Sequence, residues 1–131
     1  DRTKITAGAT FINHDGAMYT IRSMEAYKDA RNFGRIKIGE NCFVGNNCTF
    51  LPGASMGNNC ILGAGAVLNS TMPDNTVYAG SPAKFICTID QYGEKAIRNN
   101  TIYPRELEKT RSLLDAYIKE NLPHTYKPVK K

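Results

Sequence analysis

Apolar residues recur every six positions through the middle of the chain, from residue 38 to residue 73. The first position of each hexad is apolar throughout: Ile38, Val44, Phe50, Met56, Leu62 and Leu68. The fifth position is small or sulfur-bearing: Cys42, Cys48, Ala54, Cys60, Ala66 and Met72. A fixed short period of this kind is the signature of a repeat architecture.

The fourth position of each hexad indicates the local geometry. It is occupied by Asn41, Asn47, Gly53, Asn59, Gly65 and Thr71. Asn and Gly tolerate the left-handed backbone conformation that a turn every six residues requires. Each hexad is therefore predicted to be a short strand followed by a corner, with the first-position side chain inward. The pattern predicts an all-β solenoid of parallel strands, in which each coil covers its neighbours.

The same pattern starts upstream and is then interrupted. ITAGAT (residues 5–10) fits the template, and FINHDG (residues 11–16) follows with Phe11 first and His14 in the corner position. Ile38 comes 27 residues after Phe11, which is not a multiple of six. The charged segment 17–35 is therefore predicted to be a loop extruded from a corner. Long irregular loops in compact domains are usually functional, and a tolerated insertion is the alternative.

The repeat register is predicted to end after Pro73. We place the boundary of the β-helix domain somewhat later, with the domain over 1–89 and a C-terminal extension over 90–131. A helix is predicted over about 104–121, because Pro104 suits a first turn and Pro123 enforces a stop. Its apolar stripe comprises Leu107, Leu113, Leu114, Tyr117 and Ile118. This face must dock on its own coil or on a neighbouring subunit. The tail beyond it is predicted to be frayed.

Composition narrows the class of protein. A chain of 131 residues with 41% hydrophobic and 22% charged residues is predicted to be one globular domain. The net charge of +5 favours anionic partners, but there is no long Lys/Arg run, and we expect no nucleic-acid binding. No apolar run approaches the ~18 residues of a membrane span. The chain does not begin with a basic-then-apolar signal segment, and we expect a cytoplasmic protein.

Four cysteines raise the question of a metal site or disulfides. None lies in a CxxC pair, and spacings of six and twelve residues are unusual for zinc. Cys42, Cys48 and Cys60 occupy fifth positions of hexads, where a small buried hydrophobic residue belongs. We therefore predict that they are core residues and that the protein holds no metal.

The repeat region resembles the hexapeptide-repeat acyltransferases, in particular the sugar, maltose and galactoside O-acetyltransferases. The matching stretch runs from RIKIGENCF to PDNTVYAGSPAK (residues 35–84), and its closing motif is the most specific part. The resemblance implies a left-handed parallel β-helix with three hexads per coil. It also implies a homotrimer with active sites between subunits. The implied reaction is acetyl transfer from acetyl-CoA to a hydroxyl or amine, with no metal.

His14 is the candidate general base. A sugar hydroxyl needs a base such as a neutral imidazole to take its proton during attack on a thioester. From the residues alone, His14 is either that base or a histidine tolerated at a corner. The resemblance implies the first, because the family's catalytic histidine lies just before an extruded loop. His124 is the rival candidate and lies in the tail, outside every repeat.

Three other residues are candidates for contact with the acceptor. Asn13 and Asp15 flank the base, and Asp15 either touches the acceptor or satisfies the turn backbone. Adjacent side chains on an extended segment point to opposite faces, so Asp15 is not expected to bond His14 directly. The resemblance places Phe43 near the substrate cleft, and filling of the core is the alternative.

The resemblance also supplies candidate contacts to coenzyme A. Asn46, Gly63 and Ala64 match positions along the pantetheine arm, and Ser81 and Lys84 match positions toward the nucleotide. In relatives, Thr-Lys often stands where this chain has Asn69-Ser70, so one phosphate contact is in doubt. Only ten residues precede FINHDG, fewer than in most relatives, so part of the acceptor pocket is in doubt as well.

The leading prediction is an acetyl-CoA-dependent O-acetyltransferase acting on a sugar or polysaccharide precursor. N-acetylation of an amino sugar remains an alternative, as does a non-catalytic trimeric scaffold. A γ-type carbonic anhydrase would need several zinc-binding histidines, and the chain has two. The tail of a sugar nucleotidyltransferase would need a nucleotide-binding domain, and none is evident.

Overall fold

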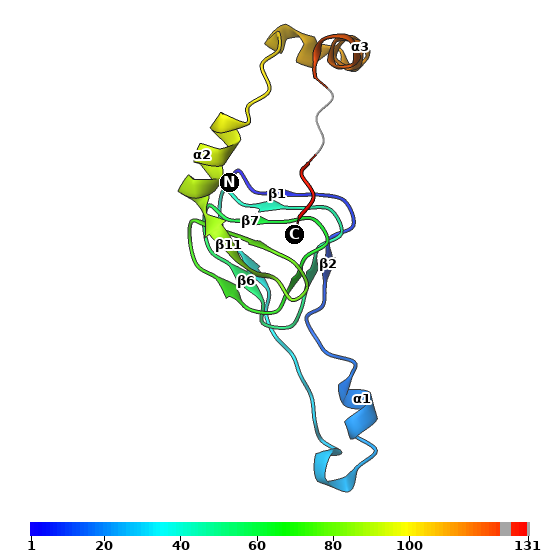
Figure 1. Cartoon of the computed structure of the whole chain (residues 1–131). Helices are drawn as coiled ribbons and strands as arrows, with labels where there is room; N and C mark the ends of the chain where they lie inside the picture. The colour runs from blue at the N-terminus through cyan, green and yellow to red at the C-terminus, as the bar shows by residue number, and fades with distance from the viewer. Residues whose placement is uncertain (124–126, 131) are drawn as a thin grey trace. The chain divides into compact units, whose positions relative to one another are not determined.

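Short strands wind into three sheets that form the walls of a solenoid (Figure 1), and their pairing is parallel except between the last two strands of the first sheet. The computed structural model describes residues 1–123 and 127–130. Sheet 1 has the order β1-β4-β7-β10-β11, sheet 2 the order β2-β5-β8, and sheet 3 the order β3-β6-β9. The strand bounds are β1 Lys4–Ile5, β2 Thr10–Phe11, β3 Lys37–Ile38, β4 Phe43–Val44, β5 Thr49–Phe50, β6 Ser55–Met56, β7 Ile61–Leu62, β8 Val67–Leu68, β9 Thr71–Met72, β10 Thr76–Ala79 and β11 Lys84–Thr88.

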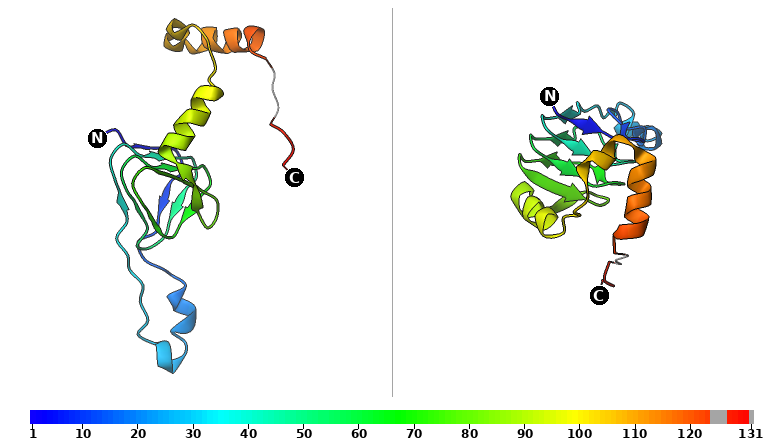
Figure 2. Two further views of the ribbon diagram at one scale, coloured as in Figure 1. Left: turned by 60° about the vertical axis from the view of Figure 1, so that its left-hand side comes forward. Right: turned by 90° about the horizontal axis from the view of Figure 1, so that it is seen from above.

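Each coil takes one strand from each sheet, and the coils stack in parallel register (Figure 2). For example, Val44 lies beside Leu62 in sheet 1, and Phe50 lies beside Leu68 in sheet 2. The first-position side chains from Val44 to Leu68 are fully buried in the axis of the solenoid. The inward stripe predicted from the hexads is therefore confirmed.

The sulfur-bearing positions are part of the same core. Cys42, Cys48 and Cys60 are at most 2% exposed and carry free thiols. Burial raises the pKa of the Cys42 thiol above its ordinary value. Each of the three thiols lies within hydrogen-bond distance of a carbonyl oxygen of the next coil, such as that of Gly57 for Cys42. The prediction that these cysteines are core residues is confirmed.

The corners have the backbone conformation that the fourth positions predict. Asn41, Asn47, Asn59, Gly53 and Gly65 all have positive φ, between 53° and 83°. At the corner between sheets 3 and 1, the asparagine amides form a ladder along the stack. Asn41 donates to Asn59 at 2.9 Å, and Asn59 donates to Asn75 at 3.0 Å. This ladder ties three successive coils together.

The predicted register of the last hexad, LNSTMP (residues 68–73), is wrong. Thr71 pairs with Ser55 and Met72 with Met56, so these partners are 16 residues apart instead of the 18 seen in the preceding coils. Only Asn69 and Ser70 connect β8 to β9, and the corner is therefore two residues shorter than the others. Met72 consequently takes the inward first position, where it is fully buried, and Thr71 does not form a left-handed corner.

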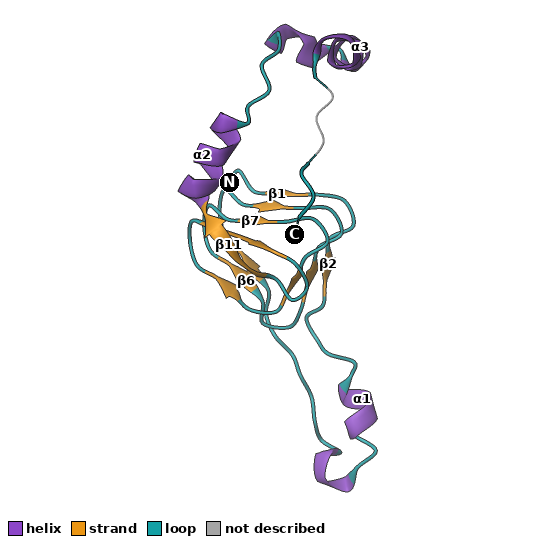
Figure 3. Cartoon of the chain, viewed as in Figure 1, coloured by secondary structure: helices purple, strands orange, loops and turns teal. Residues whose placement is uncertain are grey.

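The segment between β2 and β3 leaves the solenoid as an arm (Figure 2). It carries the short helix α1 (Met18–Ile21) and the 3-10 turn η1 (Glu25–Tyr27). Its two stems run antiparallel, joined by backbone bonds from Asp15 to Asn32 and from Gly34 to Asn13. Figure 3 shows that the arm is mostly loop, in agreement with an extruded loop over 17–35.

A helix that we did not predict follows β11. Helix α2 (Ile89–Arg98) packs against β10 and β11, and Thr88 begins it with a capping box to Gln91. The compact unit that contains the solenoid therefore ends at Asn99, later than the 89/90 boundary from the sequence.

The second compact unit, Asn100–Lys131, contains the 3-10 turn η2 (Arg105–Lys109) and helix α3 (Arg111–Asn121). The prediction of one helix over 104–121 is wrong, because the chain is extended at Thr110 with φ −134° and ψ 104°. Helix α3 begins directly after Thr110, although the Thr110 side chain makes no capping hydrogen bond. His124 lies outside the described residues.

Candidate active site

His14 lies where the chain leaves sheet 2 for the arm. It forms an antiparallel bridge with Phe33 on the returning stem. On either side of this bridge, the amide of Asp15 donates to the carbonyl of Asn32 at 3.0 Å, and that of Gly34 donates to the carbonyl of Asn13 at 2.9 Å. The backbone of His14 is thus held between two cross-stem hydrogen bonds.

The expectation that His14 occupies a left-handed corner is wrong. In the described part of the chain, the non-glycine residues with positive φ are Asn41, Asn47, Asn59 and Asn75. The coil does not turn at His14, because the chain instead continues into the paired stem of the arm. A left-handed turn therefore does not explain the presence of histidine at this position. This removes the main support for the alternative that His14 is merely tolerated at a corner.

The side chain of His14 is exposed and has two close neighbours. Its Nδ1 lies 2.8 Å from the amide oxygen of Asn13. The ring of Phe33 lies alongside, with the two ring centroids 6.2 Å apart. The Asp15 carboxylate instead accepts a hydrogen bond from the Ala17 amide at 2.8 Å, ahead of helix α1. Asp15 therefore satisfies the turn backbone, which is one of its two predicted roles.

A groove of about 650 Å³ lies between the arm stem and the core, and its lining includes Asn13 and Phe33, which contact His14, but not His14 itself. It is lined by Phe11, Asn13, Phe33, Gly34, Arg35, Ile36 and Ile38. Phe11, Phe33, Ile36 and Ile38 give it apolar wall segments, and Arg35 adds a cation. Phe33 and Arg35 were missed from the sequence because they come 19 and 21 residues after His14, and only the antiparallel stem brings them back to it.

The residues expected to contact coenzyme A stack on one corner of the solenoid, between sheets 1 and 2. Asn46 and Ala64 occupy successive coils there, and the Gly65 amide donates to the Asn46 carbonyl at 2.8 Å. The next coil continues the stack, where Gly63 donates to the Tyr78 carbonyl at 2.9 Å and Gly80 accepts from Val67 at 3.0 Å. Ser81 follows Gly80, so the structure brings Asn46, Gly63, Ala64 and Ser81 together.

Small residues at this corner allow close packing of the coils. A Cβ atom at Gly45 would lie 2.5 Å from the backbone nitrogen of Ala64, so no side chain fits there. Ala64, Gly65 and Gly80 are exposed, which makes their backbone accessible to a ligand. Lys84 begins β11 and pairs with Ala79, and its exposed cation lies at the C-terminal end of the stack.

One chain does not bring His14 and this corner together. His14 follows β2 at the base of the arm, on the side of sheet 2 that leads to sheet 3, whereas Asn46 and Ala64 lie at the corner between sheets 1 and 2. The full width of sheet 2 separates them.

Phe43 is also distant from the histidine. Its side chain is 42% exposed on β4 in sheet 1, so the alternative that it fills the core is wrong. It lines a second groove of about 610 Å³, together with Arg2, Lys4, Ile61 and Ile89 among others.

Neither a metal-binding cluster nor a membrane-spanning helix is found in the part of the chain that the structure describes. Residues 1–123 and 127–130 contain no group of three or more His, Cys, Asp or Glu side chains arranged to hold a metal ion. None of the helices in these ranges is long and apolar enough to cross a membrane.

The sequence matches one family model, described as "Bacterial transferase hexapeptide (six repeats)", over residues 35–70. It is 42% identical over 120 residues to protein CapG of Staphylococcus aureus, covering 89% of this chain and 67% of CapG. It is 45% identical over 51 residues to the putative lipopolysaccharide biosynthesis O-acetyl transferase WbbJ of Escherichia coli, covering 39% of this chain and 26% of WbbJ.

Solved structures share the fold. A galactoside acetyltransferase in complex with coenzyme A superposes with a TM-score of 0.59 at 25% identity, covering 72% of this chain and 46% of that one. A hexapeptide-repeat acetyltransferase of Vibrio cholerae gives the same TM-score at 20% identity, over 68% and 49% of the two chains. The predicted left-handed parallel β-helix is confirmed. The chain spans about half the length of these structures.

Proposed function

This chain belongs to the hexapeptide-repeat transferase family, and we propose that it moves an acetyl group from acetyl-CoA to a sugar hydroxyl. The observation that carries the proposal is the stack of small, exposed residues at the corner between sheets 1 and 2, with Lys84 at its end. A relative with this fold was solved with coenzyme A bound. The donor is a cytoplasmic metabolite, and we place the reaction in that compartment.

The corner between sheets 1 and 2 suits an extended ligand such as the pantetheine arm. At the corner between sheets 3 and 1, side chains cover the backbone: Asn58 accepts from the Glu40 amide at 2.9 Å, and Asp74 accepts from the Asn58 amide at 2.8 Å. At the other corner, Ala64, Gly65 and Gly80 are small and exposed, so their backbone groups are within a ligand's reach. We assign Asn46, Gly63 and Ala64 to the arm, and Ser81 and Lys84 to the nucleotide end.

His14 supplies the base in this mechanism. Its neutral imidazole takes the proton of the acceptor hydroxyl as the oxygen attacks the thioester carbonyl. The carbon–sulfur bond then breaks, and the proton passes from the imidazolium to the departing sulfur. The products are the acetyl ester and the coenzyme A thiol. Base catalysis of this kind contributes roughly 10²- to 10⁴-fold.

The separation of His14 from the coenzyme A corner supports a site built from two copies of the chain. We propose a homotrimer, in which His14 of one subunit faces the coenzyme A corner of its neighbour. The groove next to the arm stem then receives the acceptor, and Arg35 in its lining offers a cation to it. The second oxygen of Asp15 and the exposed ring of Phe43 are further candidate acceptor contacts.

The acceptor class rests on relatives. WbbJ is described as an O-acetyl transferase of lipopolysaccharide biosynthesis, and a galactoside acetyltransferase shares the fold. Both descriptions point to a carbohydrate hydroxyl.

An acetyl-CoA transfer screen tests the function. The purified protein is incubated with acetyl-CoA and with sugars, amino sugars or serine, while release of the thiol and the mass of the product are followed. We expect an O-acetylated sugar. An N-acetylated product would correct the acceptor class. Absence of turnover, together with no binding of coenzyme A by calorimetry, would overturn the proposal in favour of a scaffold.

A further inference from the structure

The contact between Asn13 and His14 is unusual for two neighbours on an extended segment. Successive side chains on such a segment point to opposite faces. Here the amide oxygen of Asn13 nevertheless reaches Nδ1 of the next residue at 2.8 Å. The contact therefore depends on the backbone shape at the base of the arm.

The arm stem holds both residues in this shape. The carbonyl of Asn13 accepts from Gly34, and the bridge to Phe33 pairs the backbone of His14. A Cβ atom at Gly34 would lie 2.2 Å from the backbone nitrogen of Gly53, so the returning stem fits closely against the coil below. The stem is thus fixed to the solenoid, and the backbones of Asn13 and His14 are held in the shape that allows the contact between Asn13 Oδ1 and His14 Nδ1.

We infer that Asn13 is a positioning residue that holds the proton of the His14 imidazole on Nδ1 and leaves Nε2 as the atom that accepts the acceptor's proton. An amide oxygen only accepts hydrogen bonds, so the contact requires a proton on Nδ1. The ring nitrogens of a neutral histidine are distinct, and the hydrogen bond at one decides which carries the proton. The inference rests on the proposed function, in which His14 is the base.

Two variants of Asn13 separate positioning from a direct contact with the acceptor. Asn13→Ala removes the acceptor of the Nδ1 proton, and the ring then samples other orientations and the other tautomer. We expect kcat to fall on the order of 100-fold with KM nearly unchanged, since misplacement of a reacting group has costs of this size. A rise in KM at unchanged kcat would overturn the inference and leave Asn13 as an acceptor contact.

Asn13→Asp provides the rescue. A carboxylate accepts from Nδ1–H as the amide oxygen does, so this variant should recover most of the lost kcat. A carboxylate beside the ring also favours the imidazolium, which cannot act as a base. The acidic limb of the pH–rate profile should therefore move to higher pH. If Asn13→Asp is as inactive as Asn13→Ala, the amide nitrogen is the group that faces Nδ1, and the inference is wrong.

Asn32→Ala is the matched control. It also removes an exposed amide from the stem, but the stem uses only the backbone carbonyl of Asn32, which the substitution retains. We expect wild-type kcat and KM. A loss equal to that of Asn13→Ala would mean that the stem itself is being disrupted, and would contradict a specific role for Asn13.

The tautomer of His14 can also be determined by a measurement that does not depend on enzymatic activity. The chain has two histidines, so nitrogen NMR of the ring nitrogens is assignable with a His124→Gln variant. We expect Nδ1 of neutral His14 to carry the proton in the wild type and to lose that preference in Asn13→Ala. A proton on Nε2 in the wild type would overturn the inference whatever the activity. If Nδ1 carries the proton but His14→Ala remains active, the proposed function fails and the positioning stands.

Discussion

Phe11 stacks on Phe50, with ring centroids 5.0 Å apart and planes inclined by 18°. The two rings belong to successive coils of sheet 2, but their environments differ. Phe50 is fully buried, whereas Phe11 is 46% exposed at the N-terminal end of the core. A phenylalanine thus stands both at an interior position and at an edge position of the same stack.

This pair predicts unequal losses of stability. Phe50→Ala leaves a cavity between coils and should lower the free energy of unfolding by about 3–5 kcal/mol. Phe11→Ala removes a ring that is already half in solvent, and should cost about 1 kcal/mol. Urea unfolding followed by circular dichroism measures both variants. Equal losses would contradict the assignment of Phe50 to the closed interior.

Substitution by alanine is expected to change the stability in opposite directions at Gly45 and at Gly93. A Cβ atom at Gly45 would meet the Ala64 backbone at 2.5 Å, and we expect Gly45→Ala to destabilise the solenoid by about 1–3 kcal/mol. Gly93 lies in helix α2, and beyond its chain neighbours and the helix's own backbone an added Cβ would meet no atom within 4 Å. Gly93→Ala should therefore stabilise by about 0.5–1 kcal/mol. Thermal denaturation of the two variants measures both signs, and stabilisation by Gly45→Ala would refute close packing at that corner.

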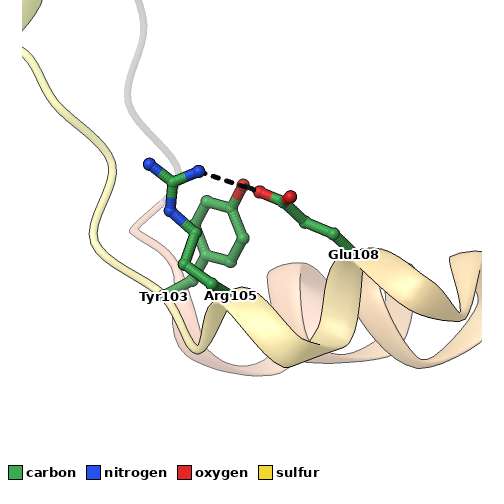
Figure 4. A network of polar contacts seen from close by, with 3 residues as sticks. All are labelled: Tyr103, Arg105 and Glu108. Carbon is green, nitrogen blue, oxygen red and sulfur yellow. Dashed lines mark hydrogen bonds and ion pairs between the residues drawn. The ribbon is translucent and has the colours of Figure 1, made fainter.

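Tyr103, Arg105 and Glu108 form an exposed polar network at η2 (Figure 4). The hydrogen bond to the Glu108 carboxylate raises the pKa of Tyr103, and accepting that bond lowers the pKa of Glu108. The stabilisation linked to Glu108 is present above its ordinary value of 4.5 and is lost as pH falls through the lowered pKa. That linked to Tyr103 is present below 10.0 and is lost as pH rises through the raised pKa.

Glu108→Gln tests this network. Without the carboxylate, the titration of Tyr103 should return toward 10.0. Carbon NMR of ring-labelled tyrosine follows the titration, and Tyr103→Phe identifies the signal. An unchanged Tyr103 titration in Glu108→Gln would show that the carboxylate is not its partner.

Lys84 should strengthen the binding of coenzyme A through its phosphates. Lys84→Met removes a charge-assisted contact, and we expect the Kd for coenzyme A to rise about tenfold. Lys37→Met is the control, because Lys37 is an exposed cation on sheet 3. Calorimetry at two salt concentrations should show a weaker salt dependence for Lys84→Met than for the wild type. An equal effect of both variants would indicate only general charge attraction.

The sequence predicted the core well because the repeat imposes one environment at each position of the hexad. Apolar or small residues such as Phe50 and Cys48 stand at every inward position, whatever the function of the protein. Asn or Gly, as at Asn47 and Gly65, stands where the backbone is left-handed. The short corner at Asn69 was not predictable in this way. The hexad LNSTMP fits the period by composition, and only the pairing of Met72 with Met56 reveals the missing two residues.

Elements outside the repeat were harder to predict. The capping box of Thr88 and Gln91 indicates the start of helix α2, but Gly93 weakens the helical pattern that follows it. The surroundings of His14 depend on contacts between residues far apart in the chain. Phe33 is brought to the histidine by the stem, and no local pattern in the sequence specifies that pairing.

A comparison of His14→Ala with His124→Ala tests most directly whether His14 is the base for acetyl transfer. Both variants are assayed for acetyl transfer, for coenzyme A binding by calorimetry and for oligomeric state by light scattering. We predict that His14→Ala loses about 10²- to 10⁴-fold in kcat, with the trimer and coenzyme A affinity retained. His124→Ala should match the wild type. Wild-type turnover by His14→Ala would contradict the account.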